Sequence, residues 1–350
     1  MKTIFVAEFL CGGGMFDTPV EHIAPTLLLE GTSMWRALID DLSAWARVVT
    51  PLDPRLKLSL PNGNVEVVEM PMDAMPWHRW IEAASDCDVA IVIVPETDHL
   101  LIQAVTQLRA AGIEVLAISN SALRLTSDKW QTAKWLHRQG IPHPETWVLE
   151  PETRHPICSH PLSTMHCQTS DGFIVKPRDG CGALEMRCYV DLDQALNSMS
   201  PHEITQRWII GRPASVSVVA CQVDHRCTFL PAVWQTFQSH RDEASDSCLS
   251  YQGGLGPVGH EFQLRSEALA TRVIKSMPGK PSGFFGMDWI AGNDPVQDSV
   301  IEINPRLTTS YVGIRRMIRE NLTRRLLTPQ IQPIVLDVHR ESVTWDLSSM

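Results

Sequence analysis

The first 120 residues alternate short β-rich runs with segments of helical periodicity, and this alternation restricts the fold more than any other feature of the sequence. Strands and helices that alternate over short connections form a parallel sheet with helices packed on its faces. The sequence therefore predicts a Rossmann-like α/β domain over residues 1–120. Its expected strands cover residues 3–9, 47–50, 65–68, 88–94 and 114–118, and its expected helices lie near 35–45, 77–84 and 101–108.

The pattern changes after residue 120. A helix is expected over 127–139, with Ser127 as its N-cap and Gly140 as its end. The segments that follow read mainly as strands, at 172–176, 203–210, 215–222, 227–234, 284–290, 299–303 and, as a closing strand, 334–345. Helices are set apart near 267–277 and 313–327, which favours an α+β arrangement. A polar, glycine-rich stretch at 238–259 predicts a long surface loop.

Composition narrows the possible functions. Thirty basic residues against forty acidic ones give a net charge of −10, which argues against a nucleic-acid partner. No apolar run approaches the ~20 residues that span a bilayer, and the first residues lack the apolar stretch of a signal peptide. Nine cysteines without a Cys-x-x-Cys pair favour reduced thiols. We therefore expect a cytoplasmic protein without membrane or nucleic-acid partners.

Histidines and tryptophans give no sign of a site. The thirteen histidines show no metal-ligand spacing, so we interpret them as surface or structural residues. Trp35, Trp45 and Trp135 have the spacing of helical core positions, so we expect them to pack in the core and not to stack on a base.

Two lysines stand out because lysine is rare, supplying seven of the thirty basic residues. Lys176 lies inside a predicted strand, where a buried ammonium group is costly unless an anion compensates its charge. The strand runs into a glycine loop, so backbone N–H groups and the ammonium can surround phosphate oxygens. The alternative is a hairpin with an exposed lysine. Lys129 opens a helix, where its charge opposes the helix dipole; a phosphate, Asp128 or solvent could offset it.

The strongest signal is a run of alternating residues in a predicted strand. Glu302 and Asn304 share one face of that strand, and Asp288 on a neighbouring strand can add a second carboxylate. Hard oxygen ligands of this kind suit Mg²⁺ that is bound mainly through nucleotide phosphates. The alternative is a solvated sheet edge.

The segments around Lys129, Lys176 and Glu302, in this order, resemble the ATP-grasp superfamily over roughly residues 123–327. The resemblance implies a two-lobed ATP-grasp fold after the Rossmann-like domain, with lobes at 121–210 and 211–330 and a tail or closing strand at 331–350. It also implies ATP and Mg²⁺ (or Mn²⁺) as cofactors. The implied nucleotide contacts are Lys129, Lys176, the loop of Gly180, Cys181 and Gly182, and the hinge residues Gln206, Trp208 and Ile209; the implied metal ligands are Asp288, Glu302 and Asn304.

The sequence departs from the family pattern at the hinge. Many members carry glutamates where this chain has Gln206 and Pro213. The amide oxygen of Gln206 can still accept a hydrogen bond from adenine. Some members place an arginine at the position of Gly286, so Arg306 is the expected group that stabilises the transferred phosphoryl, together with Lys176.

A narrower similarity is to the tyramine–glutamate ligases of methanofuran assembly and their bacterial relatives in one-carbon metabolism. It rests on residues 301–313, on Glu30, Gly31 and Met34, and on Tyr251 with the glycines after it. Ser310, Tyr311 and Arg315 open the last helix, where a substrate carboxylate could bind, and Tyr251 lies in the loop 238–259, which would act as a lid.

The expected function is therefore an ATP-dependent ligase that joins a small carboxylate to a small amine through an acyl phosphate, with glutamate and tyramine or tyrosine as the suggested pair and a homodimer as the expected assembly. Two alternatives stay open. One is a dinucleotide enzyme, suggested by the glycine run at 12–14, which lacks the Gly-x-Gly-x-x-Gly spacing. The other is a non-catalytic ATP-binding protein with a degenerate site, suggested by Gln206 and Pro213.

Overall fold

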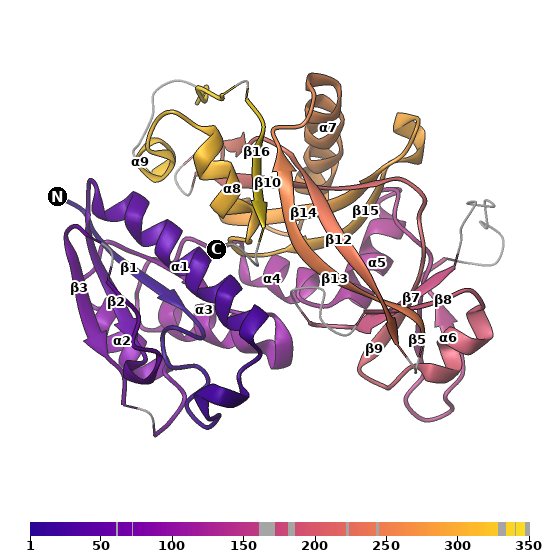
Figure 1. Cartoon of the computed structure of the whole chain (residues 1–350), viewed down its shortest axis with the longest axis horizontal. Coiled ribbons are helices and arrows are strands. Elements are labelled where there is room, and N and C mark those ends of the chain that lie inside the picture. The colour runs from indigo at the N-terminus through magenta and orange to yellow at the C-terminus, as the bar shows by residue number, and fades with distance from the viewer. Residues whose placement is uncertain are drawn as a thin grey trace.

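The computed structural model describes residues 1–346 except 61, 72, 161–171, 181–185, 222–223, 243–244, 328–333 and 340. Two sheets organise the described residues, a small parallel one near the N-terminus and a large antiparallel one (Figure 1). Within these residues, no helix has both the length and the apolar character needed to cross a bilayer.

The small sheet has the order β3-β2-β1-β4, with all neighbours parallel. Alternate residues of the central strand β1 face opposite sides. Ile4 and Val6 pack with the tryptophan and leucines of α1, whereas Phe5 and Ala7 pack with α2 and α3. The predicted α/β arrangement is confirmed here. Its elements are β1 (Thr3–Glu8), α1 (Pro25–Ser43), β2 (Arg47–Leu52), β3 (Val65–Glu69), α2 (Trp77–Ala84), β4 (Val89–Ile93) and α3 (Leu100–Ala110).

Three details of this region differ from the predictions. The expected strand at 114–118 is reduced to one parallel bridge between Val115 and Ala90. Trp45 lies beyond the end of α1, and its indole N–H donates to Thr323. Ser127 is not an N-cap, because it ends a helix that was not predicted, α4 (Asn120–Thr126). The N-cap of α5 (Lys129–Arg138) is Asp128, whose carboxylate accepts two backbone N–H groups.

The large sheet has the order β15-β14-β10-β12-β13-β8-β7-β9-β5-β6, with β11 beside β10 and β16 beside β13. Its strands are β5 (Thr146–Leu149), β6 (Pro156–Cys158), β7 (Phe173–Pro177), β8 (Met186–Tyr189), β9 (Glu203–Arg207), β10 (Arg212–Ala220), β11 (Cys227–Phe229), β12 (Val233–Asp242), β13 (Ser245–Gly256), β14 (Gly283–Ala291), β15 (Ser299–Asn304) and β16 (Val343–Asp346). The helices beside it are α6 (Leu192–Ser198), α7 (His260–Ser276), α8 (Ser310–Met317) and α9 (Leu322–Leu327). Strands β9 and β10, which precede and follow residue 210, belong to the same sheet. The predicted division of the chain at 210 therefore stays a prediction.

The predicted surface loop at 238–259 is wrong. This stretch forms most of the β12–β13 hairpin, which crosses the middle of the view in Figure 1. Its glycines serve close packing: a Cβ at Gly253 would lie 2.1 Å from the Trp345 carbonyl oxygen, and one at Gly254 would lie 2.4 Å from the Trp345 ring. The partner strand β16 is the end of the predicted closing strand.

Two other predicted elements are divided in the structure. The strand at 227–234 splits between β11 and β12, and the helix at 313–327 splits into α8 and α9. The second break falls at Ile318, which leaves the helix to form an isolated bridge with Val338.

A buried carboxylate joins helix α1 of the N-terminal region to helix α8 beside the large sheet. Asp41 of α1 accepts a 2.6 Å hydrogen bond from the Tyr311 hydroxyl and further bonds from Arg315, both on α8. Tyr311 is 2% exposed, and burial together with the Asp41 charge raises its pKa. The expectation that Tyr311 and Arg315 bind a substrate is therefore wrong, since both side chains are used to hold α8 against α1.

We expect Tyr311→Phe to destabilise the chain by about 1–3 kcal/mol, because it removes one of the two hydrogen bonds that the buried Oδ2 atom of Asp41 accepts. Urea unfolding followed by circular dichroism measures this change. The exposed neighbour Arg316→Lys is the control and should unfold at the wild-type urea concentration. Equal midpoints for Tyr311→Phe and wild type would contradict the role of this hydrogen bond.

Candidate functional site

The two lysines singled out in the sequence meet at one carboxylate. The Nζ atoms of Lys129 and Lys176 each lie 3.7 Å from Oε2 of Glu302. Lys129 is the first residue of α5, Lys176 lies in β7, and Glu302 lies in β15. Lys129 also donates to the carbonyl oxygen of Gly180. The prediction that distant segments converge here agrees with this geometry.

The charges of this group shift one another's ionisation. Burial alone would raise the pKa of Glu302, but the ammonium groups of Lys129 and Lys176 outweigh it and lower that pKa. Burial lowers the pKa of Lys176, and the Glu302 charge opposes this effect. The two ammonium groups therefore share the Glu302 carboxylate, and a bound anion can compensate their charge further.

The oxygen-rich side of the site comes from two paired strands. Asp288 of β14 is the register partner of Glu302, and Gly286 is that of Asn304. Asn304 Nδ2 donates to Asp288 at 3.0 Å, which leaves the amide oxygen of Asn304 as a free donor atom for a cation. Burial, and then the Glu302 charge, raises the pKa of Asp288 to about 6. Two close carboxylates with an amide oxygen fit a Mg²⁺ or Mn²⁺ ion, which would relieve this repulsion.

A cavity of about 640 Å³ opens above these side chains. The predicted hinge residues Gln206, Trp208 and Ile209 line it, as does Pro213. Gln206 Nε2 donates to the Thr146 hydroxyl at 3.1 Å, which orients the Gln206 amide. The cavity volume lies within the range of small-molecule sites, and its walls combine apolar side chains with a few charged groups.

Some of the other predicted site residues also line this cavity. Gly180, Ser310 and Tyr251 line it, and Tyr251 projects from strand β13 rather than from a loop. Burial raises the pKa of Tyr251 to about 12. Cys181 and Gly182 lie outside the described residues.

Arg306 has a partner that the sequence did not suggest. Its guanidinium donates to both carboxylate oxygens of Glu96, at 3.0 and 3.2 Å. Glu96 follows β4 of the small sheet, so this pair bridges the two sheets. Arg306 still lines the cavity, but it arrives there already charge-paired.

A second cavity, of about 450 Å³, adjoins the first and shares Glu30, Pro177, Gly180 and Arg306 with it. Its walls are largely apolar, with carboxylates from four acidic residues. Burial raises the pKa of Glu8 and that of Glu30 to about 7. The apolar lining residues are Phe9, Leu10, Met15, Leu27, Met34, Ile93, Val94 and Leu100, and the acidic ones are Glu8, Glu30, Asp98 and Asp179.

One sequence signal could have found Glu8 and Glu96. Glu8 is the last residue of β1, and Glu96 follows the neighbouring parallel strand β4. Ligands of open parallel sheets bind beyond the carboxyl ends of the strands, so acidic residues at these two places were candidates from the start.

The glycine run after β1 gives no support to a dinucleotide site. The N–H groups of Gly12 and Gly14 donate to the carbonyl oxygens of Glu8 and Phe9, and the N–H of Cys11 donates to the Glu8 carboxylate. These backbone donors are used inside the turn, so they cannot also bind a pyrophosphate.

Comparison with curated proteins finds distant relatives of one activity. The chain is 21% identical over 232 residues to tyramine–L-glutamate ligase of Methanocaldococcus jannaschii, covering 66% of this chain and 60% of that protein. It is 22% identical over 228 residues to the protein of the same name from Methanocaldococcus fervens, covering 65% and 62%. The chain thus spans about three fifths of the length of these relatives.

Solved structures share the fold. An ATP-grasp superfamily protein from Archaeoglobus fulgidus superposes with a TM-score of 0.68 at 23% identity, covering 93% of this chain and 88% of that one. The L-amino acid ligase of Bacillus licheniformis gives 0.59 at 12% identity, covering 93% and 73%. These likenesses confirm the predicted combination of a Rossmann-like region and an ATP-grasp fold.

Two family models match consecutive parts of the sequence. Residues 46–123 match the pre ATP-grasp 3 domain, and residues 126–310 match the ATP-grasp domain, which covers more than half of the chain. The converging lysines and the paired acidic strands lie within the second match, so the chain belongs to the ATP-grasp family.

Proposed function

We propose that the chain is an ATP-dependent carboxylate–amine ligase that works through an acyl phosphate. The observation that carries the proposal is the meeting of Lys129, Lys176 and Glu302 in the wall of the larger cavity, which the smaller cavity adjoins. The larger cavity has room for a nucleotide, and the smaller one adjoins its charged end. The names of the similar proteins, tyramine–L-glutamate ligase and L-amino acid ligase, support the same class.

The chemistry requires activation because a carboxylate does not react with an amine in neutral water. In the proposed reaction a carboxylate oxygen attacks the γ-phosphorus of ATP, and the bond from that phosphorus to ADP breaks. The amine nitrogen then attacks the acyl carbon, and the carbon–oxygen bond to phosphate breaks. Positioning and charge neutralisation carry such phosphoryl transfers.

The charged residues take distinct roles in this proposal. Lys129 and Lys176 bind phosphate oxygens, and Arg306 stabilises the transferring phosphoryl group. Asp288, Glu302 and the amide oxygen of Asn304 would hold Mg²⁺ or Mn²⁺, which when bound neutralises phosphate charge. In the chain without ligands, Glu302 keeps both ammonium groups directed at the same point.

The second cavity suits the amine. Carboxylates line it, and its basic residue Arg306 is already paired with Glu96, so an ammonium group finds complementary charge. The apolar walls suit a hydrophobic body on that amine. An ammonium must lose a proton before its nitrogen can attack, and a carboxylate whose pKa is near 7 is a suitable acceptor.

Two glutamates with raised pKa values can share the tasks of binding the ammonium group and accepting its proton. Glu30 lines both cavities, so we assign the proton transfer to it, and we assign ammonium binding to Glu8. Tyramine or tyrosine as the amine and glutamate as the acid complete the finer proposal.

We expect release of ADP and phosphate that depends on Mg²⁺ and on the presence of both an acid and an amine. With oxygen-18 in the substrate carboxylate, the label should appear in the released phosphate, because the acyl carbon–oxygen bond breaks in the second step. Mass spectrometry of the phosphate measures this transfer. Turnover that leaves the phosphate unlabelled would exclude the acyl-phosphate mechanism.

We expect Lys176→Met to lower kcat/KM for ATP by roughly a hundredfold or more, since a buried charge directed at the phosphates is lost. A coupled ADP-release assay measures the change. Lys134→Met is the matched control: Lys134 lies on α5 above the Trp130 ring, outside both cavities, and its loss should leave the rate near wild type. Nucleotide binding that survives Glu302→Ala, with no turnover in either protein, would favour the non-catalytic alternative instead.

Amine binding should strengthen as the pH rises through about 7. Glu8, the assigned ammonium ligand, has a pKa of about 7 in the folded chain, so its ionised fraction grows from pH 6 to pH 8. For one titrating carboxyl the affinity for a cationic amine such as tyramine should increase about tenfold over that interval. Isothermal titration calorimetry at each pH measures it.

The matched controls remove the charge from one side at a time. Glu8→Gln should flatten this pH dependence, and the alcohol analogue of the amine should show none with the wild-type chain. Affinity that is constant or falls with pH would count against an ammonium site between these carboxylates.

A further inference from the structure

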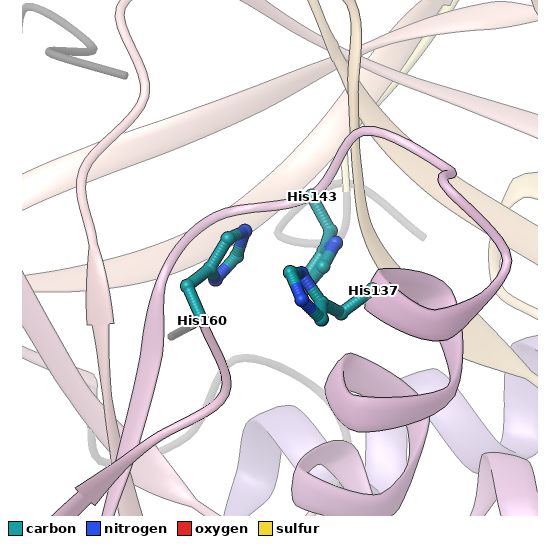
Figure 2. Close-up of side chains that lie close together, drawn as sticks. All are labelled: His137, His143 and His160. Atoms are coloured by element: carbon teal, nitrogen blue, oxygen red, sulfur yellow. The ribbon is translucent and has the colours of Figure 1, made fainter. Parts of the chain in front are cut away.

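Three histidines gather outside both cavities, although the sequence shows no metal-ligand spacing among its histidines. His137 lies in the last turn of α5, His143 in the loop before β5, and His160 just after β6. One ring nitrogen of each lies within 4.8 Å of those of the other two. Figure 2 shows the three rings turned toward one another from these separate segments. The spacing along the chain, with 5 and then 16 intervening residues, hid this cluster from sequence patterns.

His143 carries the clearest mark of a missing ligand. Its Nδ1 lies 3.0 Å from the carbonyl oxygen of Ile141, and because a carbonyl only accepts, Nδ1 holds the proton and Nε2 holds a lone pair. The ring is 3% exposed, and among the described residues its buried Nε2 has no hydrogen-bond partner. A buried acceptor without a partner costs free energy. Metal-binding histidines use the same arrangement, with the second nitrogen bonded to a carbonyl.

The surroundings favour the neutral form of the His143 and His160 rings and hold the backbone in place. Burial, and then the neighbouring histidines, lowers the pKa of His143 to about 4, and burial also lowers that of His160. Pro142 and Pro144 flank His143 and restrict its backbone. The carbonyl of Pro142 accepts from the N–H of Val300, which ties this loop to β15.

We propose that His137, His143 and His160 bind one divalent transition-metal ion of the zinc type, with water completing its coordination. Neutral imidazole nitrogens suit Zn²⁺ and Co²⁺, whereas Mg²⁺ prefers the oxygen ligands found at Asp288 and Glu302. The rings of His143 and His160 lie stacked, 4.5 Å apart, so binding requires His160 to rotate. Its side chain is only partly buried and can do so.

Such an ion would fix the end of α5 that lies opposite Lys129. His137 is eight residues from Lys129, about 12 Å along the helix axis, and α5 ends at Arg138. The ion would join this end to the loop before β5 and to the end of β6. It would therefore act on the structure of the lobe, away from the reacting groups.

Titration of the tag-free full chain with Co²⁺ tests the proposal, because Co²⁺ substitutes for Zn²⁺ and absorbs visible light when bound by few ligands. We expect one equivalent of Co²⁺ to bind with d–d absorption, and Zn²⁺ to abolish that absorption by displacement. His137→Ala and His160→Ala remove partly exposed rings, so both variants should fold, and each should weaken binding at least about tenfold.

Two control variants locate the signal. His155→Ala removes an exposed histidine of the same lobe, and Glu302→Ala removes the acidic alternative for a divalent ion; both should keep the absorption. The proposal is overturned if the full chain binds no stoichiometric Co²⁺. It is equally overturned if binding persists unchanged in His137→Ala and His160→Ala, or if it is lost in Glu302→Ala.

Discussion

The Glu302 carboxylate, held between the ammonium groups of Lys129 and Lys176, is the interaction on which the arrangement of the site depends. Glu302 lies on β15, the first strand in the order of the large sheet, and Lys176 lies on β7, six strands away. Flat neighbouring strands lie roughly 4.8 Å apart, so a contact of 3.7 Å between such distant strands requires the sheet to curl over the cavity. The attraction between Lys176 and Glu302 therefore acts across the cavity and favours the curled form of the sheet.

A second ion pair connects this site to the small sheet. Arg306 follows β15 and pairs with Glu96, which follows β4, and the two cavities meet beside this pair. One cavity is rich in cations and the other in carboxylates, and Arg306 lies where the sign changes. In the proposed reaction, this difference in charge would direct the anionic nucleotide to one cavity and the cationic amine to the other. The N-terminal region therefore contributes to the site as well as to the fold.

Sequence patterns predicted the local parts of this protein better than its long-range contacts. Short β-rich runs identified β1 and β4, and the rarity of lysine singled out Lys129 and Lys176, because these signals lie within a few residues. The glycines at 253 and 254 were misinterpreted as loop residues, since their cause is Trp345, about ninety positions away. Tyr311 and Arg315 were assigned to a substrate for the same reason: their partner, Asp41, lies 270 or more residues distant. The three histidines acquire meaning only from tertiary proximity, whereas the places of Glu8 and Glu96 at the ends of predicted parallel strands were a sequence signal that the predictions missed.

Gly31, which has no side chain, limits which substitutions the wall of the second cavity can accept. A methyl group there would come within 2.8 Å of the Glu8 carboxylate, so helix and strand touch at that point with no room left between them. A larger residue at position 31 would therefore displace Glu8, so this part of the wall cannot change in sequence without moving the carboxylate. Adaptation to a larger or smaller ligand must therefore come from other lining residues, such as Met15, Leu27 and Met34, whose flexible side chains can be exchanged without touching the carboxylate.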